Sequence, residues 1–169
     1  MIRKAILVGM FLGLILLAIQ PAVAQFPSTS PLVGSWQLAL TPSSPTSPVV
    51  PIPALATFTA DGSVVETDGS EVTPAMVSTV HIVYGTPGHG IWQPAPAIGN
   101  LFIQFISLMV NPNASLHAKR IVTIIGALDS TGENFKGTYD SHLVDPTGHT
   151  IVMSTVTVRG QKIPHPLLP

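Results

Sequence analysis

Long apolar stretches separated by short polar turns make up most of the second half of the chain. Four segments of about ten residues, rich in β-branched and aromatic side chains, each predict a β-strand, at 101–110, 118–128, 135–144 and 150–159. The connections between them are short, rich in Asn, Asp, Pro and Gly, and lie at 111–115, 129–133 and 145–148. Because so short a connection cannot carry a parallel crossover, we expect an antiparallel meander.

The first half of the chain predicts shorter strands. The first strand is expected at 33–40, and the segments 55–59 and 63–67 are expected to pair as a hairpin. Asp61-Gly62 between them predicts a two-residue type I′ turn, which needs positive φ angles. The segment 41–53 contains five prolines and is expected to be a loop, because proline cannot donate to a sheet ladder.

The segment 71–84 permits two interpretations. Its part 77–84 is dense in β-branched residues and favours a strand, whereas Thr73-Pro74 could begin a helical turn or a lid. With a further strand at 89–93, the total is eight or nine. Eight antiparallel strands of this length close into an up-and-down barrel, and an open two-sheet sandwich is the alternative. The expected fold class is therefore all-β, a single barrel over 33–160.

The N-terminal segment predicts export. A positively charged start precedes an apolar run at 5–19, and Ala-Val-Ala at 22–24 is typical of a signal-peptide cleavage site. The run is shorter than the roughly 20 residues that a membrane span needs. We therefore expect a signal peptide at 1–24 and a secreted or periplasmic protein without membrane contact. Asn113 begins an Asn-x-Ser sequon, which is a glycosylation site only in a eukaryotic secretory pathway.

Composition narrows the function classes. Charged residues are 9% of the chain and the formal net charge is −1, so the clustered basic face of a nucleic-acid-binding protein is missing. Cys is absent, which excludes disulfides and thiolate metal sites. The six His residues show no H-x-H or H-x-x-x-H spacing, so neither a metal nor a cofactor is expected. The Pro-rich ends of the mature chain, 25–32 and 161–169, are expected to be a loosely ordered leader and tail.

Two of the long strands, 101–110 and 118–128, are apolar on both faces. A strand with one face in water alternates cleanly. We therefore expect the outer face to be covered by the lid, by the Pro-rich loop or by another subunit, which makes a homo-oligomer a candidate.

Polar residues in the predicted strands are the candidates for a site. His89 stands between two glycines and could face a ligand, or it could belong only to a tight turn. Arg120 lies in an apolar strand and could anchor a ligand carboxylate, or it could lie in water at the strand mouth. Asp140 and His142 share one face of their strand and could move a proton if that face is interior. The opposite face, which carries Tyr139, is the better candidate for the interior.

Gly34-Ser35-Trp36 opens the first predicted strand and Arg159 ends the last one. In these residues the chain resembles the lipocalins, calycin-type barrels in which a Gly-x-Trp indole packs across an arginine of the final strand. The resemblance implies that Trp36 and Arg159 close one end of the barrel, through a contact worth about 0.5–2 kcal/mol. More loosely, the chain resembles allene-oxide-cyclase-type barrels, which include cofactor-free cyclases and isomerases.

Three functions fit these observations. The first is a barrel that binds a small apolar ligand, oriented by His89 or Arg120 and lined by Trp92, Phe102, Ile106 and Tyr139. The second is a cofactor-independent isomerase or cyclase, in which His89 or the pair Asp140 and His142 moves a proton. The third is a structural or interaction protein with a filled barrel.

Overall fold

The structure is a computed structural model. It describes residues 30–42, 50–69, 75–78, 81–95 and 101–164. In this part of the chain there are ten β-strands, and no helix is long and apolar enough to cross a membrane. The signal peptide predicted at 1–24 lies outside the described residues, as do most of the leader and the end of the tail.

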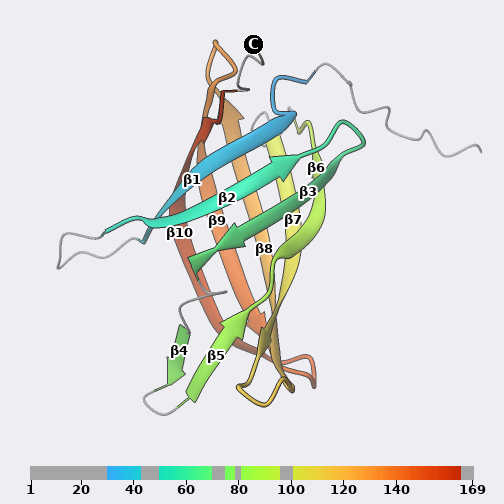
Figure 1. Cartoon of the computed structure of the whole chain (residues 1–169), viewed down its shortest axis with the longest axis vertical. Helices are drawn as coiled ribbons and strands as arrows, with labels where there is room; N and C mark the ends of the chain where they lie inside the picture. Colours follow the sequence, from blue (N-terminus) through green and yellow to red (C-terminus); the bar gives the residue numbers. More distant parts are fainter. Residues whose placement is uncertain (1–29, 43–49, 70–74, 79–80, 96–100, 165–169) are drawn as a thin grey trace, which may run out of the picture.

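The last four strands follow the predicted segments closely and are the longest (Figure 1). Their bounds are β1 Gly34–Pro42, β2 Ile52–Phe58, β3 Ser63–Asp68, β4 Ala75–Ser78, β5 His81–Gly85, β6 Gly88–Gln93, β7 Leu101–Val110, β8 Leu116–Leu128, β9 Asn134–Val144 and β10 Thr150–Lys162.

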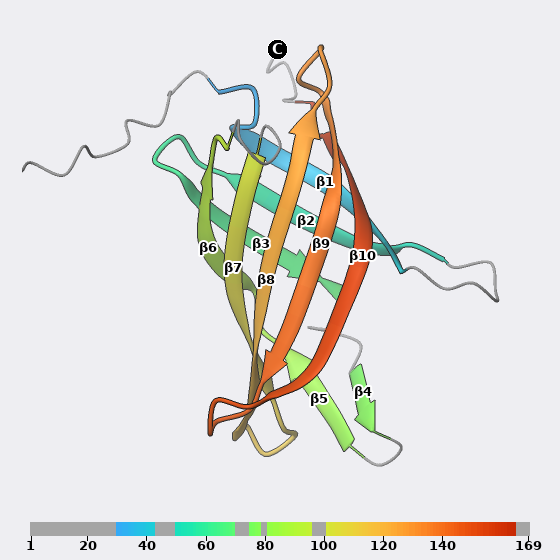
Figure 2. The same cartoon turned by 180° about the vertical axis from the view of Figure 1, so that it is seen from behind.

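Eight of these strands form a closed antiparallel barrel. Their order around the barrel is β1-β2-β3-β6-β7-β8-β9-β10, and β10 pairs back with β1. Every neighbouring pair is antiparallel, so the predicted all-β, up-and-down barrel is confirmed. Strands β1 to β3 cross obliquely over the long strands β7 to β10, as the opposite views in Figures 1 and 2 show.

The segment 71–84 forms neither one continuous strand nor a helical turn in its described part. Strands β4 and β5 pair with each other antiparallel, and residues 79–80 between them lie outside the described residues. Strand β5 joins β7 through Tyr84 opposite Val110 and Gly85 opposite Met109. The prediction of a single strand at 77–84 is therefore wrong, and the β4–β5 pair lies at the lower end of the barrel in Figure 1.

The tight turns share one geometry. Each turn ends at a residue with positive φ, whose N–H donates to the carbonyl three residues earlier. The type I′ turn predicted at Asp61-Gly62 is wrong, because Asp61 does not have a positive φ. The residues with positive φ in these turns are Gly62 at 87°, Ala114 at 64°, Gly132 at 73° and Gly148 at 93°.

The Pro-rich loop is shorter than predicted. Strand β1 continues to Pro42, and β2 begins at Ile52 and includes Pro53 opposite Ala39. Strand β3 ends opposite Ala54, so no β3 residue needs the N–H that Pro53 lacks. Residues 43–49, the centre of the predicted loop, lie outside the described part.

Aromatic side chains fill one part of the barrel interior, and we call them the aromatic cluster. They are buried and pack edge to face, which is a favourable arrangement for ring quadrupoles. The ring centroids are 5.4 Å apart for Trp36 and Phe135 and 6.5 Å apart for Phe58 and Trp92. Phe105 packs edge to face on Tyr139, which lies outside this cluster, with centroids 6.1 Å apart.

A cation closes the barrel end near Trp36, but it is not the predicted one. Lys162 Nζ lies 5.9 Å from the Trp36 ring centroid and donates to the carbonyl of Pro31 at 2.6 Å. Strand β10 runs to Lys162, beyond the predicted end, and its alternation turns Arg159 to the exposed outer face. The predicted contact between Trp36 and Arg159 is therefore wrong. The indole also donates to the carbonyl of Leu32 at 2.8 Å.

The outer face of the barrel carries apolar side chains. Ile91, Ile106 and Leu108 are 52%, 46% and 40% exposed. Among the described residues nothing covers these outward side chains, and the homo-oligomer stays a prediction.

Candidate functional site

One layer of the barrel interior is polar, and we call it the interior polar layer. It consists of Glu66, Asp68, Ser107, Arg120 and Tyr139, which come from β3, β7, β8 and β9. Glu66 and Ser107 are each 1% exposed, and Tyr139 is 4% exposed. Ionisable side chains are rarely buried to this degree unless they are paired.

The guanidinium of Arg120 connects the layer. Its Nε donates to Ser107 Oγ at 2.8 Å, and its Nη1 donates to Asp68 Oδ2 at 2.6 Å. Its Nη2 lies 3.5 Å from Glu66 Oε2, within ion-pair distance. The planar fork is therefore held on three sides, from β3 and β7, and its orientation is fixed.

Gly88 makes room for these contacts. Strand β6 lies between β3 and β7, and Gly88 on β6 pairs with Glu66. A Cβ at Gly88 would lie 2.5 Å from Phe105 Cδ2 and 3.3 Å from Glu66 Oε2. Any larger residue would displace the Phe105 ring or the carboxylate, so the glycine lets Arg120 reach across β7 and β6 to Glu66.

The hydroxyl of Tyr139 is buried and has no hydrogen-bond partner among the described residues. Burial raises the pKa of Tyr139 well above its ordinary value, the charge of Arg120 opposes this rise, and Glu66 and Asp68 add to it. The phenol is therefore neutral across the physiological range, and its hydroxyl can both donate and accept a hydrogen bond.

Arg120 keeps its charge inside the barrel. Burial alone lowers the pKa of Arg120, but Tyr139, Asp68 and Glu66 outweigh that effect and raise the pKa above its ordinary value. Its side chain is 13% exposed, so solvent reaches the layer. The prediction that Arg120 could anchor a ligand carboxylate meets a difficulty, because the guanidinium already donates to Asp68 and Ser107 and lies within ion-pair distance of Glu66.

The predicted ligand-lining residues divide between the two faces of the barrel. Trp92 and Tyr139 are buried in the interior, as the hypothesis requires. Phe102 is half-buried, Ile106 is 46% exposed, and both lie on the outer face. Strand β7 turns its odd-numbered residues inward, so placing Phe102 and Ile106 in the lining is wrong.

The predicted proton-transfer residues lie outside the barrel. Asp140 accepts a hydrogen bond from Thr155 Oγ1 at 2.6 Å, and with His142 it lines an outer pocket of about 490 Å³. The interpretation that places Tyr139 inside and the charged face of β9 outside is confirmed. His89 is exposed on the outer face opposite Ile106, so it does not face the barrel interior.

Sequence reasoning does not find Glu66, Asp68 and Ser107. A signal existed for Ser107, because it is the polar member of the otherwise apolar odd-numbered set of β7. A signal also existed for Glu66, because strand alternation places it on the same face as the apolar Val64. Within the described part of the chain, no three His, Cys, Asp or Glu side chains gather in a way that could hold a metal ion.

Fold and site together define a class of protein, a closed eight-stranded antiparallel β-barrel with a charged layer in its interior. Comparison with known proteins finds no matching family model, no matching curated protein and no matching solved structure. The function therefore has to be argued from the residues of the barrel itself.

Proposed function

We propose that the protein is an exported, lipocalin-like barrel that binds a small, mainly apolar molecule at its interior polar layer. The observation that carries this proposal is the Tyr139 hydroxyl, which is buried beside charged groups without a hydrogen-bond partner in the described chain. Buried polar atoms in native proteins nearly always have a partner. A ligand oxygen or nitrogen at this hydroxyl would supply one.

The layer favours a ligand whose polar group is uncharged. Two carboxyl groups, Glu66 and Asp68, face a single cation, so a ligand carboxylate would meet repulsion. A hydroxyl or carbonyl can bond to Tyr139 without that cost. The ligand body would contact apolar neighbours, with Phe105 on one side and the smaller cluster around Met109 on the other.

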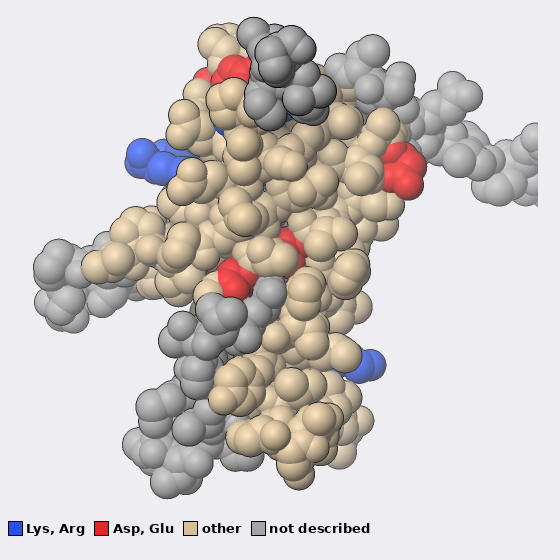
Figure 3. All heavy atoms as spheres, viewed as in Figure 1, with Lys and Arg blue, Asp and Glu red and all other residues tan. Residues whose placement is uncertain are grey.

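The end of β3 is the proposed route of entry. Asp68, the last residue of β3, has a side chain that is 6% exposed, and Arg120 is also partly exposed. Figure 3 shows acidic atoms exposed near the middle of this face of the molecule.

Two further observations support the lipocalin-like and exported character. Gly34-Ser35-Trp36 opens β1, and a cation from the last strand lies over the Trp36 indole, although it is Lys162. The segment 1–24 has the charge pattern and cleavage site of a signal peptide. Binding is favoured over proton-transfer catalysis because His89, Asp140 and His142 face away from the interior.

The test uses 1-octanol, an apolar chain with one hydroxyl, and measures the thermal midpoint of unfolding. A ligand that binds only the folded state raises this midpoint with concentration. We expect octanol to raise the midpoint of the wild type. For Tyr139→Phe, at least a tenfold higher octanol concentration should be needed to produce the same shift. Tyr84→Phe is the matched control, because Tyr84 is the other tyrosine of the chain and is exposed.

The outcomes separate cleanly. A saturable octanol shift that Tyr84→Phe keeps and Tyr139→Phe loses supports the proposal. No saturable shift in the wild type, or an equal shift in both variants, contradicts it.

A further inference from the structure

Two cations stand directly opposite each other on the outer face of the barrel. Lys136 on β9 pairs with Arg159 on β10, and both side chains are exposed. No ion pair to an acidic side chain is formed by either one in the part of the chain that the structure describes. Like charges directly opposite each other destabilise a sheet. In a chain with only seven Lys and Arg, this juxtaposition is not a by-product of a crowded charged surface.

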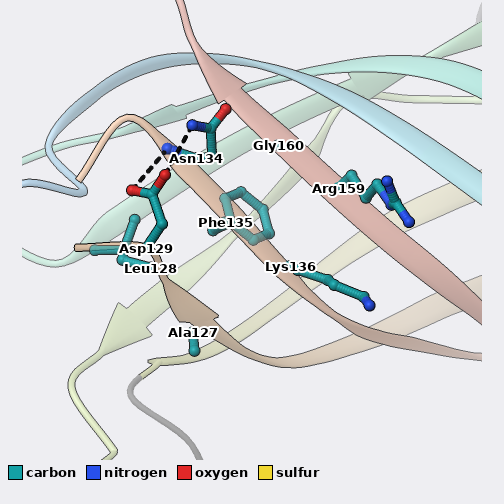
Figure 4. A pocket seen from close by; sticks show the side chains of 8 residues that line it. All are labelled: Ala127, Leu128, Asp129, Asn134, Phe135, Lys136, Arg159 and Gly160. Carbon is teal, nitrogen blue, oxygen red and sulfur yellow. Dashed lines mark hydrogen bonds between the residues drawn. The ribbon is translucent and has the colours of Figure 1, made fainter. Parts of the chain in front are cut away.

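The two cations border a pocket of about 540 Å³, shown in Figure 4. Alanines flank the pair in register, with Ala127 opposite Lys136 and Ala39 opposite Arg159, so small side chains leave the charged groups accessible. In the figure, Lys136 and Arg159 extend toward the same side. The lining also includes Leu128, Phe135 and Gly160, but Phe135 is 3% exposed and Leu128 packs against the barrel core. The outward-facing apolar surface of the pocket therefore comes from Ala127 and the aliphatic stems of the two cations.

The one carboxylate in this pocket is already bound by its own turn. Asp129 Oδ2 accepts from Asn134 Nδ2 at 2.8 Å, and Oδ1 accepts from Thr131 Oγ1 at 2.8 Å. The backbone N–H of Glu133 also points to Oδ1, at 3.3 Å. Asp129 therefore stabilises the β8–β9 turn and is not the counter-charge of Lys136 and Arg159.

We propose that this pocket binds one anionic group, a carboxylate or a phosphate, carried by a small molecule with a short apolar body. The Arg159 fork can hold two oxygens of such a group, and Lys136 adds a second charge. Ala127 and the aliphatic stems of Lys136 and Arg159 contact the body. This site is distinct from the interior polar layer, because Lys136 and Arg159 face outward while the layer faces the barrel interior.

The test follows backbone amide resonances by NMR during titration with octanoate. We expect saturable shifts at Ala127, Lys136, Arg159 and Gly160, and affinity at least tenfold weaker in the double variant K136A/R159A. Lys119→Ala is the control, because Lys119 is an exposed cation on β8 outside the pocket lining and should leave the affinity unchanged. Binding should weaken at 0.5 M salt, because salt screens exposed charges.

Three further arms identify the ligand chemistry. Octyl phosphate should shift the same amides as octanoate, acetate should bind more weakly because it lacks the body, and 1-octanol should leave these amides unshifted. Octanoate shifts that are equal in wild type and K136A/R159A, or that centre on residues 66–68 and 139, contradict the proposal. Tyr139→Phe should not affect octanoate binding, so failure of this site and failure of the interior site are distinguishable.

A stability measurement separates a binding role from a structural one. The ligand-free K136A/R159A variant should unfold at the same urea concentration as the wild type, or at a higher one, because like-charge repulsion is removed. A lower midpoint would show that the pair supports the sheet and would contradict the proposal.

Discussion

The aromatic cluster and the interior polar layer lie in the same barrel but differ in how their buried polar groups are hydrogen-bonded. In the aromatic cluster, Trp36, Phe58 and Trp92 are at most 1% exposed, and both indole N–H groups donate to backbone carbonyls. In the polar layer, one guanidinium holds two carboxyl groups and a hydroxyl, and the Tyr139 hydroxyl has no bond to the described chain. The indole N–H groups of the aromatic cluster therefore have protein partners, whereas the Tyr139 hydroxyl of the polar layer does not have one in the described chain.

The difference indicates which region carries the stability of the barrel. Buried aromatic area contributes favourably wherever it is well packed. A buried ion pair contributes little net stability, because desolvation offsets the Coulomb attraction. We therefore infer that the aromatic cluster holds the barrel closed, and that the polar layer contributes little to its stability.

The largest effect is expected for Trp92→Ala. Trp92 is 1% exposed and packs edge to face on Phe58, so its removal leaves a cavity and should cost about 3–5 kcal/mol of unfolding free energy. Urea denaturation measures this loss. Ile91→Ala is the control, because Ile91 is 52% exposed on the outer face and should change the free energy by less than about 0.5 kcal/mol. Equal losses in the two variants would contradict the account.

The next effect is expected for Arg120→Met. This change removes the cation and leaves Glu66 and Asp68 inside the barrel, which should cost about 3 kcal/mol in the same measurement. Adding Glu66→Leu and Asp68→Leu should recover most of the loss, since replacing the whole charged group costs less than breaking it. A triple variant that is less stable than Arg120→Met would show that the ion pairs are a net source of stability.

A smaller effect of opposite sign is expected for Tyr139→Phe without ligand. The change deletes a buried hydroxyl that has no partner in the described chain, so the variant should be as stable as the wild type or more stable by about 1 kcal/mol. Chemical denaturation of the ligand-free proteins measures the difference. A loss of more than about 1 kcal/mol would indicate that the hydroxyl is bonded within the protein.

The smallest effect concerns Asp129, in the β8–β9 turn. The hydrogen bond from Asn134, followed by that from Thr131, lowers the pKa of Asp129 to about 2. Because the folded pKa lies below the unfolded one, this stabilisation is present above about pH 4 and is lost as the pH falls toward 2. An NMR titration should place the midpoint near 2, and Asn134→Ala should move it upward. A midpoint that Asn134→Ala does not change would contradict the assigned cause.

Strand pattern and turn residues predict most of this fold, because both are local properties. The strand at 101–110 was predicted with the bounds of β7, and the up-and-down closure followed from the short turns. Which face of β7 lies inside could not be decided, because Phe102 and Ile106 are as apolar as Ile103 and Phe105. Only pairing with β6 and β8 selects the inner face.

The candidate site was less predictable, because it depends on contacts between distant strands. Arg120 is a predicted site residue because it is a charge in an apolar strand. Its partners Asp68 and Glu66 lie 52 and 54 positions earlier in the sequence, so the sequence pattern does not connect them. The same limit explains the error at Trp36, where the extra length of β10 brings Lys162 over the ring. Residue type predicts what a side chain can do, and register decides which partner it meets.

The most direct test of the account is a crystal structure of the protein isolated from cells that produce it, inspected at the Tyr139 hydroxyl. We predict an oxygen or nitrogen of a bound organic molecule within about 3.2 Å of that hydroxyl, while Arg120 keeps its bonds to Asp68 and Ser107. A Tyr139 hydroxyl that instead donates directly to Glu66 or Asp68 would close the polar layer on itself and contradict the proposed binding function.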